Sequence, residues 1–248
     1  MKVSAIDIGN SSIKLSFIEA GKITFFRRVN DGELNTLINF AASDAIVISS
    51  VNPAKARTIY SYFNKKFKGT LLSLDSKSKY SFGNSYRNRQ SLGVDRLCGA
   101  EGAYFLEAER ESKPDVIITA DFGTATTINV VEEQTFIGGY IIPGARLSFK
   151  ALNQNTAFLP KVDKKFGFEE IGRDTLNCML SGVILAGVSL LERTFIAYQT
   201  KYSTVPSVYV TGGNADYFLA HIKHPYTFVK ELTAIGMYSV AAKMIEKN

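Results

Sequence analysis

Two short segments of this 248-residue chain place a carboxylate beside a glycine and small polar side chains. Asp7 ends an apolar run and is followed by Gly9, and Asp121 ends a second run and is followed by Gly123. Glycine lets a phosphate approach the backbone closely, and a carboxylate can hold Mg²⁺ through water. A single tip of this kind more often only forms a tight hairpin turn, in which the polar side chains hydrogen-bond the backbone. Two tips in equivalent places, with a glycine pair at 212–213, favour a phosphate-binding pair of hairpins.

Other catalytic signatures are absent from the sequence. It contains no Walker-type phosphate loop and no G-x-G-x-x-G after a strand. His221 and His224 have no cysteine neighbours and adjoin no nucleophile motif, so we expect surface histidines. Cys98 and Cys178 lie among small and apolar residues, which predicts buried thiols in a reducing compartment.

The elements that must position these tips follow from hydrophobic periodicity and turn residues. The first half reads as three strands, a helix, a strand, a helix that begins at Pro53, and a further strand. The second half repeats the strand, tip and hairpin order, which predicts an internal duplication. The expected strands are 2–8, 13–17, 23–29, 45–49, 70–74, 115–121, 128–132, 135–142 and 206–211, the expected helices are 34–41, 53–67, 93–111, 145–155, 173–198 and 231–246, and 75–92 is expected to be a loop.

The composition is that of an ordinary globular protein, with 29 Lys and Arg against 23 Asp and Glu. The net charge of +6 suits an enzyme that handles anionic substrates. The densest basic segment, 161–165, is interrupted by Asp163 and is expected to be a solvated loop, so no nucleic-acid partner is predicted. Asp7 and Asn10 interrupt the apolar start, so we expect no signal peptide, and we expect no apolar run near the roughly 20 residues that cross a bilayer. These expectations predict a cytoplasmic protein without a membrane partner.

Five ordered motifs resemble those of type III pantothenate kinases, within the actin-like superfamily of sugar kinases, acetate kinases and chaperone ATPases. They are Asp7-Ile8-Gly9-Asn10-Ser11, Tyr86 with Leu92-Gly93-Val94-Asp95-Arg96, Asp121 to Thr127, Gly138 to Gly144, and Thr211-Gly212-Gly213. The resemblance covers nearly the whole chain. It implies an α/β fold of two duplicated actin-like (ribonuclease H-like) domains, each with a mixed βββαβαβ-type sheet flanked by helices, and a cleft between them. We place the domains at 1–115 and 116–248, and packing of the last helix against the first domain stays open.

The resemblance implies ATP-dependent phosphorylation of pantothenate to 4′-phosphopantothenate, the first step of coenzyme A biosynthesis. In this reading Asp95 is the general base that accepts the proton of the pantothenate hydroxyl. Without the flanking motifs, Asp95 and Arg96 are equally well an acidic helix start with a surface arginine. ATP and Mg²⁺ are expected at Asp7, which holds the ion through water, and at Ile8, Gly9, Asn10, Ser11, Ser12, Ile13, Lys14 and Thr124. Pantothenate is expected at Tyr86, Gly93, Val94, Asp95, Arg96 and Thr175.

The resemblance also implies a monovalent cation, K⁺ or NH₄⁺, at Asp121, and a homodimer. Thr175 is equally well a helix-capping or buried hydroxyl. The family usually has Thr where Ser11 stands and Asp where Asn129 stands. The first change keeps the hydroxyl, whereas the second removes a carboxylate and can weaken the binding of the monovalent cation or of Mg²⁺. Two alternatives stay open: a non-catalytic accessory or regulatory protein with the same fold, and a phosphatase of the actin-like superfamily.

Overall fold

The computed structural model describes residues 1–9, 12–29, 43–108, 113–162 and 168–246. The chain divides into two compact units. The first comprises Met1–Lys113, Val131–Gly138 and Glu231–Asn248, and the second comprises Pro114–Val130 and Gly139–Lys230. The helix expected over 34–41 lies outside the described residues, as does most of the basic segment 161–165.

The first unit is built on a five-stranded sheet in the order β3-β2-β1-β4-β5. The central strand β1 is antiparallel to β2 and parallel to β4, which gives the mixed sheet expected from the sequence. The strands are β1 (Lys2–Ile8), β2 (Ile13–Glu19), β3 (Lys22–Val29), β4 (Ala45–Ser50) and β5 (Thr70–Ser73), and the α-helices in the described part of this unit are α1 (Pro53–Lys66), α2 (Val94–Glu107) and α5 (Leu232–Ile245).

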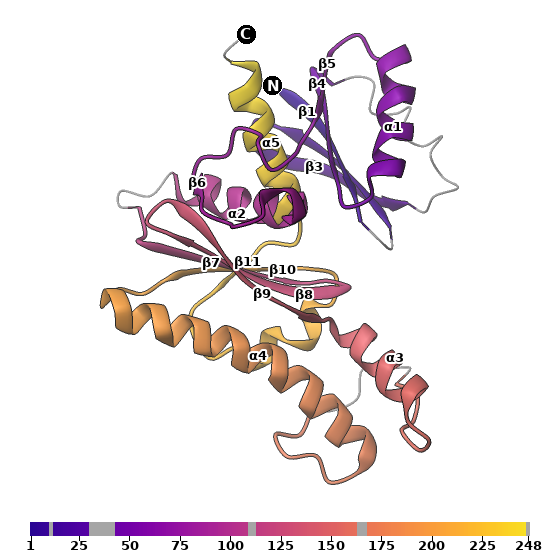
Figure 1. The fold of residues 1–248 in the computed structure, drawn as a ribbon, viewed down its shortest axis with the longest axis vertical. Helices are drawn as coiled ribbons and strands as arrows, with labels where there is room; N and C mark the ends of the chain where they lie inside the picture. The colour runs from indigo at the N-terminus through magenta and orange to yellow at the C-terminus, as the bar shows by residue number, and fades with distance from the viewer. Residues whose placement is uncertain (10–11, 30–42, 109–112, 163–167, 247–248) are drawn as a thin grey trace. The chain divides into compact units, whose positions relative to one another are not determined.

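Alternate residues of β1 and β4 face two different hydrophobic clusters, because successive side chains of a strand point to opposite faces. Ile6 and Ile48 pack with Ile59 of α1. Ala5 and Val47 pack on the other face, in a cluster with buried residues of α2 and α5. Figure 1 shows α1 on one side of the strands and α2 with α5 on the other. The face of a residue on β1 or β4 is therefore fixed by whether its number is odd or even.

Helices α2 and α5 approach each other closely at two glycines. A Cβ atom added to Gly102 would lie 2.2 Å from the carbonyl oxygen of Leu232. A Cβ atom added to Gly236 would lie 1.8 Å from the carbonyl oxygen of Cys98. No side chain fits at such distances, so the two glycines allow the backbones to touch.

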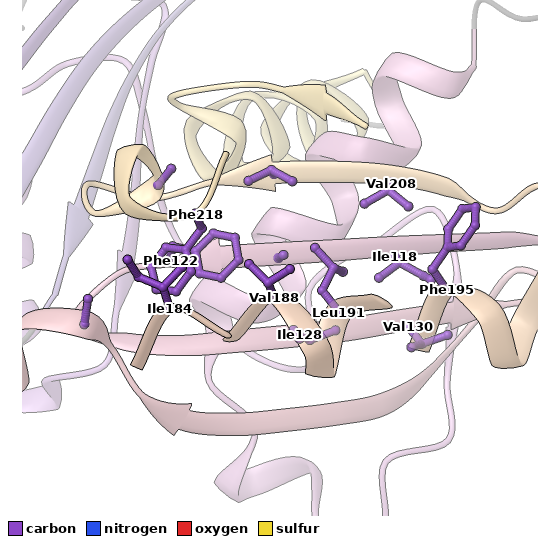
Figure 2. Packing of buried hydrophobic residues seen from close by; sticks show 14 of the residues in the cluster. Ile118, Phe122, Ile128, Val130, Ile184, Val188, Leu191, Phe195, Val208 and Phe218 are labelled. Atoms are coloured by element: carbon purple, nitrogen blue, oxygen red, sulfur yellow. The ribbon is translucent and has the colours of Figure 1, made fainter. Parts of the chain in front are cut away.

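The second unit contains β7 (Val116–Phe122), most of β8 (Ala125–Glu132), the end of β9 (Thr135–Pro143), β10 (Ser207–Thr211) and β11 (Thr227–Phe228), with helices α3 (Ala145–Asn155) and α4 (Thr175–Tyr202). The second sheet has the order β11-β10-β7-β8-β9-β6, and β6 (Gly83–Asn84) belongs to the first unit. Figure 2 shows the core of the second unit, where Val188 and Leu191 of α4 pack over Ile118. Phe122 and Phe218 stack with their ring centroids 4.0 Å apart.

Four expectations from the sequence are corrected by the structure. The segment 75–92, expected to be a loop, contains the short strand β6, which pairs with Thr135 and Phe136. Cys178 is exposed rather than buried, because it lies on the outer side of the first turns of α4. His224 is buried rather than at the surface, and its ring stacks on Phe195 with centroids 4.2 Å apart.

The fourth correction concerns α4. Among the described helices it alone is long and apolar enough, by length and composition, to cross a membrane, although we expected no apolar run of that length. The core helix of a soluble protein passes the same test. Ile184 and Phe195 of α4 are buried in the core of the second unit, and 39% of the apolar window of this helix is buried, so packing in this core accounts for part of the apolar composition.

Candidate active site

The first polar cluster lies where β1 ends and β2 begins. Asp7 and Lys14 are partners in the register of these two strands, and the Lys14 ammonium lies 3.2 Å from Oδ2 of Asp7. The Gly9 N–H donates to the carbonyl of Ser12 at 3.1 Å, and a Cβ atom at Gly9 would lie 3.3 Å from that oxygen. The hairpin therefore presents a carboxylate and an ammonium near Gly9.

The other predicted residues of this hairpin divide into two groups. Ile8 and Ile13 are buried in the cluster under α1, so their side chains face away from Asp7 and only their backbone can meet a ligand. Ser12 is half-buried at the tip. Asn10 and Ser11 lie outside the described residues.

The first turn of α2 provides a second carboxylate to the same region of this unit. Gly93 is the N-cap residue, and the Arg96 N–H donates to Oδ1 of Asp95 at 3.0 Å. Burial raises the pKa of the Asp95 carboxyl above its ordinary value, and the nearby charge of Asp7 raises it further. Arg96, Lys14 and the hydrogen bond from the backbone act in the opposite direction. The charge of Asp7 acts on the Asp95 carboxyl, so the two carboxylates belong to the same region of the first unit.

Arg96 is held between two aromatic rings. Its guanidinium carbon lies 5.6 Å from the centroid of Tyr86 and 5.7 Å from that of Phe136, and the residue is buried. The Tyr86 N–H donates to Oδ1 of Asn84 at 2.9 Å, which fixes the start of this segment. Cation–π contacts of this kind orient a guanidinium without neutralising its charge. Tyr86 and Arg96 thus lie together, Asp95 precedes Arg96 in the first turn of α2, and Phe136 is a neighbour that no motif indicated.

A buried carboxylate anchors α2 to its surroundings. Glu101 is fully buried and accepts hydrogen bonds from the Ser81 N–H at 2.7 Å, the Ser81 hydroxyl at 2.9 Å and the Ser239 hydroxyl at 2.5 Å. Its Oε1 also lies 2.5 Å from the Lys243 ammonium. This network joins α2 to α5 and to the segment before Tyr86. Sequence reasoning missed it, because one Glu in an apolar helix gives no sign of its partners.

Cys98 lies one turn after Asp95 and is unsuited to nucleophilic catalysis. Burial raises the pKa of its thiol well above the ordinary value, and the charges of Asp7, Asp95 and Glu101 raise it further. A thiol in such surroundings stays protonated and inert.

The hairpin of the second unit also places a glycine N–H against a backbone carbonyl beyond its strand. The Gly123 N–H donates to the carbonyl of Ala125 at 3.1 Å. The carboxylate of Asp121 lies against Gly212, where an added Cβ atom would be 2.5 Å from Oδ1 and where φ is +109°. The Asn214 amide donates to the carbonyl of Gly123 at 2.7 Å. Only glycine fits beside this carboxylate in that conformation.

The remaining predicted residues of the second unit are Thr124, Asn129 and Thr175. Thr124 is exposed at the hairpin tip. The buried Asn129 amide donates to the Thr119 hydroxyl at 3.2 Å, so the departure from Asp is accommodated by a hydrogen bond within the sheet. Thr175 is the exposed first residue of α4, whose N-cap Asp174 accepts a hydrogen bond from the Asn177 N–H.

Solved structures of low sequence identity share this fold. One is described as a Baf family transcriptional activator from Campylobacter jejuni, with a TM-score of 0.64, 18% identity, and coverage of 98% of this chain and 99% of that one. Another is the activator of 2-hydroxyisocaproyl-CoA dehydratase from Clostridium difficile with bound ADPNP, with a TM-score of 0.51, 13% identity, and coverage of 100% and 97%. Together with the two mixed sheets, these likenesses define the actin-like fold class that the sequence predicted.

The family is shown by sequence. The family model described as type III pantothenate kinase matches residues 4–197, so the chain belongs to this family and is a kinase. A type III pantothenate kinase of Persephonella marina is 29% identical over 96% of this chain and 97% of that protein. The enzyme of the same name from Thermosipho melanesiensis is 28% identical over 94% and 95%. Membership of a kinase family implies the use of ATP.

Proposed function

We propose that the chain transfers the γ-phosphoryl group of ATP to the hydroxyl of pantothenate and so performs the first step of coenzyme A biosynthesis. The relatives named type III pantothenate kinase match this chain over almost their whole length. The observation that carries the proposal is the pair of carboxylates in the same region of the first unit, one at a phosphate-type hairpin and one with a raised pKa. One carboxylate can hold the metal–phosphate group while the other accepts a proton.

The hairpin of Asp7 is the proposed donor site, and its residues fit a magnesium–nucleotide. Asp7 offers a carboxylate, Lys14 a cation and Gly9 a backbone that a phosphate can approach. Within the described parts of the chain, no three His, Cys, Asp or Glu side chains gather to form a metal site. Mg²⁺ tolerates this because it is commonly held by one or two carboxylates, water and phosphate oxygens. Bound there, the ion would neutralise charge on the transferred group.

Asp95 is the proposed general base. A carboxylate with a raised pKa is the stronger base, which suits the acceptance of the proton of the attacking hydroxyl. Arg96 is proposed to bind the pantothenate carboxylate or a phosphoryl oxygen, because its aromatic neighbours hold the guanidinium in place. Tyr86, Gly93, Val94 and Thr175 complete the proposed acceptor site.

Asp121 is proposed to hold K⁺ or NH₄⁺, and Thr124 to contact ATP. The glycines packed against the Asp121 carboxylate support a fixed anionic group at this hairpin. An Asp121→Asn variant is expected to lose its response to added K⁺, which an assay over a series of K⁺ concentrations measures. We further propose a cytoplasmic homodimer, as the resemblance implies.

The proposal is tested with purified protein, ATP, Mg²⁺, K⁺ and pantothenate, by following ADP release. Pantothenate-dependent turnover supports the kinase function, and its absence would refute it. Phosphate release without pantothenate would favour the phosphatase alternative, and nucleotide binding without turnover would favour the accessory protein. Asp95→Asn is expected to lower the rate at least about 100-fold if Asp95 is the base. Asp75→Asn, a change at an exposed turn, is the matched control and is expected to keep the rate.

A further inference from the structure

Ser49 lies beside Asp7 in the sheet of the first unit. The two residues are register partners on the parallel strands β4 and β1, which lie about 4.8 Å apart in a sheet. Register partners point to the same face, and both continue the row that faces α2 and α5. Since β1 lies between β2 and β4, Asp7 has Lys14 on one neighbouring strand and Ser49 on the other.

The Ser49 hydroxyl is fully buried and has no hydrogen-bond partner among the described residues. Buried hydroxyls nearly always have a partner, so this one calls for an explanation. Two serines of the same sheet differ from it. Ser50 donates to the carbonyl of Asn52 at 2.8 Å, and the hydroxyls of Ser4 and Ser43 lie 2.6 Å apart.

We propose that Ser49 is a positioning residue for Asp7, and that its hydroxyl donates to the Asp7 carboxylate when a magnesium–nucleotide is bound. Carboxylates that hold metal ions are usually oriented by a hydrogen bond from a residue that does not touch the metal. Ser49 suits this role because its burial keeps it from contacting a ligand directly. The inference rests on the donor site of the proposed function and not on the identity of the acceptor.

The test is ADP binding by calorimetry over a series of Mg²⁺ concentrations, with wild-type protein and the Ser49→Ala variant, and without pantothenate. We expect the Mg²⁺ concentration for half-maximal binding to rise roughly 10- to 100-fold in the variant. We expect its melting temperature without ligands to be no lower than that of the wild type, because no hydrogen bond is lost. Ser49→Cys keeps the side-chain shape and a weak hydrogen-bond donor. We expect its Mg²⁺ concentration for half-maximal binding to lie between those of the wild type and Ser49→Ala.

Ser4→Ala is the matched control, since it removes an equally buried hydroxyl that has a partner. This variant is expected to melt at a lower temperature with an unchanged Mg²⁺ requirement. An unchanged Mg²⁺ requirement in both Ser49 variants would overturn the proposal, as would a loss of stability in Ser49→Ala equal to that of Ser4→Ala. ADP binding without pantothenate turnover would refute only the assigned acceptor, whereas absence of ADP binding by the wild type would refute the donor site and this role together.

Discussion

Gly93→Ala should separate the position of the proposed base from the stability of the fold. Gly93 is the N-cap of α2, with φ −60° and ψ 128°, angles that alanine adopts without strain. An added Cβ atom would lie 2.4 Å from Oδ1 of Asp95. The obstacle is the end of a side chain, so the carboxylate can rotate away at little cost to folding.

The size of the effect follows from the distance. Ordinary contact of a Cβ atom begins at 3.4 Å, so the carboxylate oxygen has to move by about 1 Å, and a misplacement of about 1 Å can cost roughly 100-fold in rate. Alanine stiffens the unfolded chain by about 0.4–1 kcal/mol but is a poorer N-cap, so the two effects on stability largely cancel. We expect kcat to fall about 100-fold with a small change in melting temperature.

A coupled ADP assay and a thermal melt measure both quantities. Gly99→Ala is the control, because it makes the same change in α2 at a position where no atom lies within 4 Å of the new Cβ. It is expected to keep kcat and to gain up to about 1 kcal/mol of stability. A Gly93→Ala enzyme with wild-type kcat would refute the reasoning, since it would show that the carboxylate need not stand where the structure places it.

Asp95→Asn is expected to lower kcat by about two to four powers of ten while raising the melting temperature at neutral pH. The raised pKa of Asp95 means that folding disfavours its ionised carboxyl. The wild type therefore loses stability as the pH rises from 3.8 through the pKa of the folded state. Thermal melts of both proteins across that range should give melting temperatures that converge at low pH. Gly236→Ala is expected to cost at least about 1–3 kcal/mol in chemical unfolding, because its Cβ would lie 1.8 Å from the Cys98 carbonyl. Glu101→Ala is expected to cost about 3 kcal/mol, because it removes the buried carboxylate that accepts hydrogen bonds from Lys243, Ser81 and Ser239, and full stability in urea would contradict this.

Much of the fold could be predicted from the sequence, because its strands and helices carry strong local signals. The alternation through Ile13 and Leu15, the proline at the start of α1 and the apolar run before Asp121 each mark an element where the structure has one. Contacts between distant residues carried no such signal. The strand β6 is two residues long and forms only because Gly83 and Asn84 meet β9.

The candidate site shows the same division. Asp7, Asp95 and Arg96 were selected because they stand in motifs, and the structure places all three in the first unit. Phe136 and Glu101 were missed because their role depends on what packs against them. Burial was misjudged for Cys178 and His224 for a related reason: the sequence gives the polarity of neighbours along the chain but not the side of the helix or the ring that covers them.

Ser49 and Ser50 show where local sequence reasoning ends. The two serines are adjacent and chemically identical, so no pattern distinguishes them. Strand geometry places them on opposite faces of β4, and the register with β1 then sets Ser49 beside Asp7 while Ser50 caps the turn before α1. A hydroxyl with a partner contributes to folding, whereas a buried one without a partner costs stability unless something binds. The unpartnered Ser49 hydroxyl therefore costs stability in the ligand-free protein. The hydrogen bond to Asp7 that we propose for the nucleotide-bound protein gives a reason for this cost.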